Sequence, residues 1–274
     1  MRNRVRIFSV LLFAVLDIVS SFALGNRLDQ DQTPSSAPIA YFLPFSLTFA
    51  IWGIIFSSAL VYAVYQALPA QHDRVLHKRI GGWIALNAAL TALWNVTAGQ
   101  AGNQGTTDFR PVLVVLTVVI LAGMLFSLTR VFIIFREMDA EITRRDRWLV
   151  QIPVTIFFAW LNVAAIANTT AALLALNFTG EPNGALWAVA MLIVATVLAT
   201  LMILYSRPTA GTIAYSSVIV WAVIGILINN SSRSMPIVIT SILSSIIVIV
   251  VTIYHMRRSD PEQRLQPRVL GRAS

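Results

Sequence analysis

The chain has 274 residues, of which 57% are hydrophobic and 12% are charged, and its mean hydropathy is +0.75. A soluble domain carries about 25% charged residues and could not bury this much apolar surface, so the composition excludes an ordinary soluble fold. The absence of cysteine excludes disulfides, thiolate metal sites and cysteine nucleophiles. The net charge of +8 fits either a nucleic-acid or a membrane-surface partner, and the positions of the charges decide between them.

Eight apolar stretches have lengths close to the roughly 20 residues that a helix needs to cross a bilayer. In chain order they are residues 7–24, 41–68, 80–96, 111–135, 148–176, 186–205, 212–227 and 236–254. These stretches are continuous, whereas barrel strands alternate apolar and polar residues. The sequence therefore predicts an all-α, polytopic membrane helix bundle with about eight transmembrane helices.

The first stretch, residues 7–24, follows basic residues and could instead be a cleaved signal peptide, which would leave seven helices. Asp17 interrupts its apolar core and no clear small-x-small cleavage site precedes Gly25, so we expect the helix to be retained. Asp17 would lie near the middle of the bilayer, where a carboxylate is costly and often functional. It is a possible proton site or packing site.

Basic residues mark one side of this predicted topology. All 20 Lys and Arg residues except Arg27, Arg110 and Arg233 lie in the N-terminal segment, in the C-terminal tail, or in or beside the loops after the second, fourth and sixth stretches. Because basic loops remain in the cytoplasm, we expect a multi-pass protein of the cell (inner) membrane with a cytoplasmic N-terminus and C-terminus. The lipid bilayer then accounts for the charge, and no nucleic-acid partner is expected.

Polar and indole side chains recur at helical spacing inside these stretches. Asn87 and Thr91 share one face of the third stretch, and Trp160, Ala164 and Asn168 share one face of the fifth. Such polar groups either cross-link helices in a structural or assembly role or line a small-molecule cavity. With the deep tryptophans added, the candidate ligand-binding residues are Trp52, Trp94, Trp160, Ala164, Asn168, Asn87 and Thr91.

No feature of the sequence indicates catalysis. The P-loop, dinucleotide-binding, H-E-x-x-H and G-x-S-x-G patterns are missing. Asp139, Glu141 and Asp146 lie among arginines in a predicted loop, where we expect a solvated surface. With three histidines, two of them in one charged loop (His72 and His77), a metal site is not expected. The sequence thus predicts neither an enzyme nor a resident cofactor.

Short motifs in the second, third and fifth stretches resemble the tryptophan-rich sensory protein family, also called the translocator-protein or peripheral benzodiazepine-receptor-like family. Pro44 precedes Trp52 by eight residues and Phe56 follows it by four, similar to the family's proline-then-tryptophan helix opening, where Tyr usually holds the last position. Residues 91–94 are similar to N-x-x-W with Thr in place of Asn. Residues 160–168 are similar to W-x-x-F-A-x-x-L-N.

The resemblance implies a tryptophan-rich sensory protein-like membrane region of five helices at residues 1–177. Three additional helices at 178–256 and a basic tail at 257–274 suggest an extended bacterial branch. Family members bind porphyrins, haem-like tetrapyrroles or sterol-type lipids, often as a homodimer. The resemblance thus implies a receptor-like or sensory protein that binds or carries a flat hydrophobic ligand, with Trp52, Trp94, Trp160, Ala164 and Asn168 in its pocket.

Two matters remain open at this level. The family's P-P pair is reduced to Pro44 alone and the asparagine of its third helix is replaced, which leaves the choice of ligand undecided. The alternative function is a proton-coupled small-molecule transporter that uses Asp17, although no internal repeat of the kind common in transporters is visible.

Overall fold

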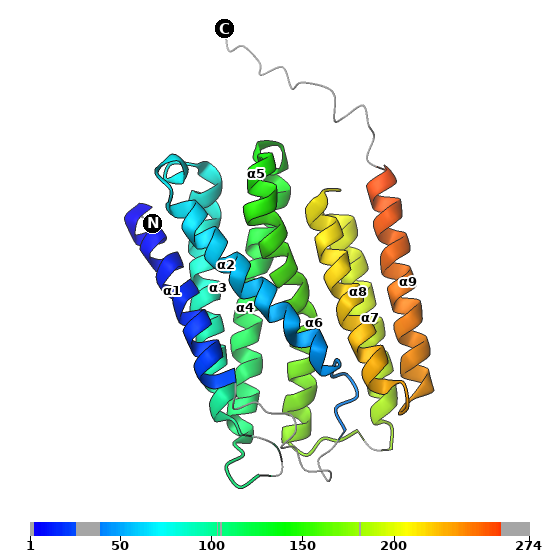
Figure 1. Cartoon of the computed structure of the whole chain (residues 1–274). Helices are drawn as coiled ribbons and strands as arrows, with labels where there is room; N and C mark the ends of the chain where they lie inside the picture. Colours follow the sequence, from blue (N-terminus) through cyan, green and yellow to red (C-terminus); the bar gives the residue numbers. More distant parts are fainter. Residues whose placement is uncertain (1–2, 26–38, 103, 105, 181, 259–274) are drawn as a thin grey trace.

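The computed structural model describes residues 3–25, 39–102, 104, 106–180 and 182–258, without the side chains of residues 13, 17 and 20–25. Within these residues the chain forms eight long helices and no strand, so the predicted all-α bundle is confirmed (Figure 1). The long helices are α1 (Asn3–Gly25), α2 (Ile51–Ala67), α3 (Val75–Gln100), α4 (Pro111–Glu137), α6 (Ile152–Ala175), α7 (Gly184–Tyr205), α8 (Ala210–Asn230) and α9 (Met235–Arg258). Short helical turns occupy η2 (Ser46–Ala50), η3 (Pro69–Gln71), η4 (Asp139–Glu141), α5 (Arg144–Asp146) and η5 (Arg147–Gln151).

Six helical segments of the described chain are long and apolar enough to cross a membrane. They are Ser46–Ala67, Pro111–Glu137, Arg144–Ala175, Gly184–Tyr205, Ala210–Asn230 and Met235–Arg258. The protein is therefore a multi-pass membrane protein. Helices α1 and α3 are not among these six. Helix α3 packs along α4, and α1 packs mainly on α3 and also on α2. The prediction that α1 and α3 also cross stays a prediction.

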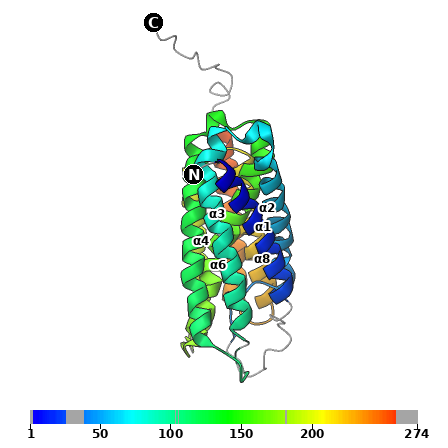
Figure 2. The same ribbon diagram turned by 90° about the vertical axis from the view of Figure 1, so that its left-hand side faces the viewer.

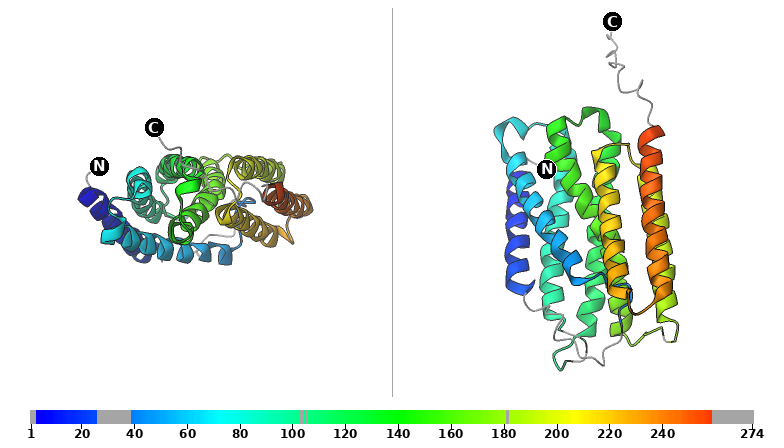
Figure 3. Two further views of the ribbon diagram at one scale, coloured as in Figure 1. Left: turned by 90° about the horizontal axis from the view of Figure 1, so that it is seen from above. Right: turned by 45° about the vertical axis from the view of Figure 1, so that its right-hand side comes forward.

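The helices form an elongated bundle, with α1 at one end and α9 at the other (Figure 3). Helix α3 packs between α1 and α4, as Figure 2 shows from the α1 side. The chain of contacts continues from α4 to α6, from α6 to α8, and from α8 through α9 to α7. Helix α2 runs obliquely across the face formed by α1 and α6 (Figure 1).

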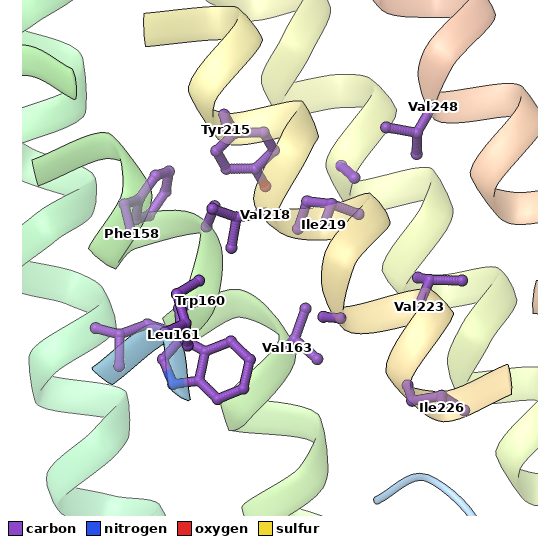
Figure 4. Packing of buried hydrophobic residues seen from close by; sticks show 14 of the residues in the cluster. Phe158, Trp160, Leu161, Val163, Tyr215, Val218, Ile219, Val223, Ile226 and Val248 are labelled. Atoms are coloured by element: carbon purple, nitrogen blue, oxygen red, sulfur yellow. The ribbon is translucent and has the colours of Figure 1, made fainter. Parts of the chain in front are cut away.

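Two apolar clusters hold this bundle together. The larger one joins α2, α4, α6, α7, α8 and α9, and its members include Trp160, Ile219 and Val248 (Figure 4). The smaller one joins α1, α2, α3 and α4 around Tyr62 and Ile80. Because the larger cluster is continuous across the contact of α6 with α8, the last three helices pack directly on the first five.

The second predicted stretch begins too early, because the helix does not start at residue 41. Pro44 disfavours helical geometry in the residue before it, and the backbone from Tyr41 to Phe45 is not helical. Instead, the Phe45 N–H donates to the Gly225 carbonyl of α8 at 2.9 Å. The helical segment starts only with the turn η2 at Ser46.

Asp146 is buried, so the expectation of a solvated acidic surface is wrong at this residue. Its carboxylate has no exposed surface and accepts from the Tyr65 hydroxyl at 2.9 Å, the Arg74 guanidinium at 2.5 Å and the Thr143 hydroxyl at 2.6 Å. Thr143 and Asp146 also form a capping box at the start of α5. These contacts tie α2, the start of α3 and the segment before α6 together.

Candidate functional site

Three tryptophans from different helices border one cavity of about 130 Å³. Trp52 comes from α2, Trp94 from α3 and Trp160 from α6. Each of these helices also packs against other helices of the bundle. Ala164 and Asn168 follow Trp160 at i+4 and i+8 on the same face of α6. The remaining lining residues are Leu43, Pro44, Phe49, Leu121, Met124, Leu161, Val163, Ala167 and Ala171.

Trp52 is the centre of an aromatic cluster along this cavity. Its ring is stacked with that of Trp94, at 6.1 Å between centroids and 22° between planes. It meets Trp160 edge-on at 6.3 Å and 82°, and Phe49 meets Trp160 edge-on at 5.6 Å. These are the favourable geometries for aromatic pairs. The cavity therefore offers flat apolar surfaces in two roughly perpendicular orientations.

Asn168 joins three helices at one edge of the cavity. Its side-chain oxygen accepts from the Trp94 indole N–H and from the Thr117 hydroxyl of α4, both at 3.3 Å. Its amide N–H donates to the Ala164 carbonyl of its own helix at 2.9 Å. Asn168 thus fixes the orientation of Trp94. These contacts support the interpretation that the polar side chains of α6 cross-link helices, although Asn168 also lies on the cavity wall.

Trp160 carries an unused hydrogen-bond donor. Its side chain is 2% exposed and its indole N–H has no partner among the described residues. A buried N–H without an acceptor costs roughly 1–3 kcal/mol. Figure 4 shows the ring of Trp160 beside the backbone of α6, close to Leu161. The cavity that this ring borders is the space in which an acceptor could lie.

Asn87 and Thr91 do not reach this cavity. Asn87 donates to the Met124 carbonyl and to the Ser127 hydroxyl of α4, each at 3.0 Å. Thr91 donates to the Asn87 carbonyl at 2.9 Å. Asn87 therefore cross-links α3 to α4, whereas the Thr91 hydrogen bond lies within α3. Asn87 also lines a separate space of about 50 Å³ that contacts α1. The side chain of Asp17 lies outside the described residues.

Part of the cavity wall is formed by Leu43, Pro44 and Phe49. They belong to a segment, Tyr41 to Phe49, whose support the sequence motifs did not identify. Helix α8 holds it in place, because Asn229 and Asn230 donate to the Leu43 and Tyr41 carbonyls at 2.8 and 2.9 Å. The Trp221 indole donates to the Thr48 carbonyl at 3.0 Å. The run of two asparagines near the end of α8 was the available signal.

Comparison with known proteins identifies the family. A family model described as TSPO-like protein matches residues 4–254, which includes all three helices beyond the first five. No curated protein and no solved structure matches the chain. The match therefore extends the resemblance of the first five predicted helices to nearly the whole bundle, and the chain belongs to the TSPO-like protein family.

Proposed function

We propose that this protein is a receptor-like membrane protein that binds or carries a flat hydrophobic ligand in the cavity bordered by Trp52, Trp94 and Trp160. The observation that carries the proposal is the convergence of three indoles from three helices on one cavity, with no acceptor for the Trp160 N–H among the residues that the structure describes. Membership of the TSPO-like family supports it. The proposed location is the cell membrane, with both termini cytoplasmic, and no catalytic step is assigned.

The cavity favours an uncharged aromatic or polycyclic group. No charged side chain is among the residues that line it, and an ion placed there would lack a partner, which is costly in an apolar site. Stacked and edge-on indoles reward a planar apolar group. The Trp160 N–H adds one requirement, since an acceptor on the ligand would satisfy it.

The volume limits how much of the ligand can enter. An engineered cavity of about 150 Å³ holds one benzene molecule, and the tryptophan cavity has a similar size of about 130 Å³. A tetrapyrrole or a sterol is larger than this. We therefore propose that one ring of such a ligand inserts between the indoles while the rest extends between the helices, or that Trp52 and Trp94 rotate to admit more.

A porphyrin titration tests the proposal. The full chain in detergent is titrated with protoporphyrin, and binding is followed by the fluorescence of the porphyrin, so that removal of a tryptophan does not remove the signal. Trp160→Ala and Asn168→Ala should each weaken binding at least about tenfold, as expected for buried anchor residues. Trp83→Ala is the matched control, because Trp83 contacts Phe126 and Arg130 away from the cavity.

Unchanged helical circular dichroism and an unchanged elution volume show that each variant is folded. Equal porphyrin affinity in the wild-type chain and all three variants would remove the tryptophan cavity as the ligand site. A sterol added as competitor separates the two ligand classes, since only a shared site makes the sterol displace the porphyrin.

A further inference from the structure

A second cavity, of about 270 Å³, lies on the opposite side of α6 from the tryptophans. It is lined by α6, by the first half of α7, by residues 178–180 between these helices and by the residues before η2, including Tyr41 and Phe42. None of its lining residues borders the tryptophan cavity. Neighbouring residues of α6 separate the two spaces, since Ala164 faces the tryptophan cavity and Ala165 faces the second one.

The cavity exists because α6 and α7 follow each other in the chain but have different main packing partners. Helix α6 packs mostly on α4 and α8, whereas α7 packs mostly on α9. At the end of α6, Asn177 has φ 64° and the Phe178 N–H donates to the Leu173 carbonyl at 2.9 Å. That pattern is a Schellman cap. It folds Phe178 back over the end of α6, where it closes part of the cavity.

Gly184 allows Tyr41 to pack closely against the start of α7. A Cβ atom on Gly184, at the start of α7, would lie 3.3 Å from the ring of Tyr41, which is tighter than ordinary contact. The Tyr41 backbone is itself fixed by Asn230 of α8. The residues that line the cavity are therefore held in place by other contacts of the fold, and their packing leaves a space of about 270 Å³ between them.

The lining chemistry selects the kind of ligand. Its walls are mostly apolar, with no charged side chain among the residues that line it and with hydroxyl-bearing side chains from Tyr41, Thr169, Thr170 and Thr179. Thr169 and Thr170 donate to the carbonyls of Ala165 and Ile166 at 2.8 and 3.0 Å, which leaves lone pairs of their oxygens for a donor on the ligand. An uncharged molecule with a hydroxyl group fits both features.

The rim points to the source of the ligand. Phe178 and Trp187 meet edge-on at 6.2 Å and both are about half exposed. Trp187 lies in the first turn of an apolar helix that can cross a membrane, the position where tryptophan marks the boundary of the bilayer. A ligand that enters beside these rings comes from the outer layer of the hydrocarbon region, with its polar end toward the interface.

We propose that this second cavity is a separate binding site for a neutral, hydroxyl-bearing hydrocarbon that is taken from the bilayer. The space is nearly twice the roughly 150 Å³ that holds one benzene, so it accommodates a two-ring phenol or a medium-length alkyl alcohol. The hydroxyl hydrogen-bonds to Thr169 or Thr170 and the hydrocarbon lies against Ile166 and Met191. The proposal does not depend on ligand binding in the tryptophan cavity.

Photolabelling tests the site. The full chain in lipid nanodiscs is exposed to a medium-chain alcohol that carries a diazirine, and the labelled peptides are identified by mass spectrometry. The expected labels lie on residues 165–174 and 184–191. Excess unlabelled alcohol should reduce them at least about fivefold, whereas the carboxylic acid of the same chain length, charged at pH 7, should reduce them much less because a buried charge would be unpaired.

Ala165→Phe and Ala164→Phe form a matched pair, because the two residues are adjacent and face different cavities. Ala165→Phe fills the second cavity and should reduce the labelling at least about fivefold, while Ala164→Phe should leave it unchanged. Ala188→Leu, on α7, fills the same cavity from the other wall and serves if Ala165→Phe does not fold. The proposal would be overturned if labelling persisted in both filled variants or were lost only in Ala164→Phe. It would also be overturned if the acid and the alcohol reduced the labelling equally.

Discussion

Asp146 is a buried acidic residue that joins several segments at the arginine-rich end of the bundle. Its buried carboxylate accepts from Tyr65, Arg74 and Thr143, which come from three different segments of the chain. A buried charge is costly without partners but stable when all of its oxygen lone pairs are used. The same end carries an exposed ion pair between Asp73 and Lys78 at 2.9 Å, which offers a direct comparison.

Asp146→Ala should lower the free energy of unfolding by about 2–3 kcal/mol. Loss of one partner of a buried pair costs roughly 3–5 kcal/mol, and the value here is smaller because Arg74 is 31% exposed and can regain water. Asp73→Ala is the control, since exposed pairs contribute little. Thermal unfolding in detergent measures both variants. Equal melting temperatures for the two would show that the Asp146 network is not stabilising.

His77 should make the stability depend on pH. It lies in the first turn of α3, outside the apolar stretch. Burial lowers its pKa from 6.5 to about 4. The charge of Asp146 raises the pKa, whereas the charges of Arg6 and Arg74 lower it further. The unfolded chain therefore binds more protons between these values, so stability should be full above pH 6.5 and fall toward pH 4. The shift corresponds to at most on the order of 3 kcal/mol.

Comparison of His77→Gln with the wild-type chain isolates this contribution, because Gln does not titrate. Melting temperatures measured from pH 7 to pH 4 should fall less steeply in the variant. Parallel curves for the two proteins would assign the pH dependence to other groups.

Residue spacing predicted the main walls of the tryptophan cavity but not its connections. Trp160, Ala164 and Asn168 share a helix face by spacing alone, and the structure brings that face to Trp52 and Trp94. Asn87 has the same kind of spacing but packs on α4. Spacing defines which side chains share a face of a helix. The helix that covers this face is determined by tertiary packing, which cannot be predicted from local residue spacing.

At the scale of elements, the contact between η2 and α8 determines the shape of both cavities. Leu43, Pro44 and Phe49 border the tryptophan cavity, and Tyr41 and Phe42 border the second one. Gly225 of α8 allows this contact, because a Cβ there would lie 2.1 Å from the Thr48 hydroxyl oxygen. The three helices after the first five thus contribute directly to the proposed sites.

Gly225→Ala should therefore destabilise the protein by about 1–3 kcal/mol, the usual cost of overpacking, and weaken porphyrin binding by displacing η2. Gly53→Ala is the matched control, because nothing lies within 4 Å of a Cβ at that position of α2, and alanine favours helix more than glycine does. Thr48→Ala combined with Gly225→Ala should restore part of the loss by removing the clashing atoms. Unfolding and porphyrin titration measure all three, and a neutral Gly225→Ala would show that η2 adjusts freely.

The existence of the helices could be predicted from apolar length, because lipid offers the backbone no hydrogen-bond partners and each span must satisfy its own. Their ends could not. Polar residues extend α3 beyond the apolar stretch 80–96 to Val75 and Gln100, and Pro44 delays the start of the second helical segment until Ser46. Helix ends depend on local caps and tertiary contacts, which hydropathy does not report.

At the scale of the whole molecule, the described ends of the chain lie on the same side of the bundle. The first turn of α1, the loop before α3, the segment from Asp139 to Gln151 and the end of α9 gather at that side (Figure 1). This arrangement requires an even number of crossings between Asn3 and Arg258. It agrees with the alternation of basic loops in the sequence and supports the proposal that all eight long helices cross.

Helix α3 provides the sharpest test of this topology, because it is not among the six segments that are apolar enough by themselves. The chain has no cysteine, so single cysteines can be placed at the exposed positions Asp73, Thr107 and Glu141. In intact cells, an impermeant maleimide should label Thr107→Cys and should label Asp73→Cys and Glu141→Cys only after the membrane is opened. Labelling of Asp73→Cys and Thr107→Cys from the same side would show that α3 does not cross, since these two positions flank it. Labelling of Asp73→Cys and Glu141→Cys, but not of Thr107→Cys, in intact cells would instead show that the orientation is the reverse of the one that the basic loops predict.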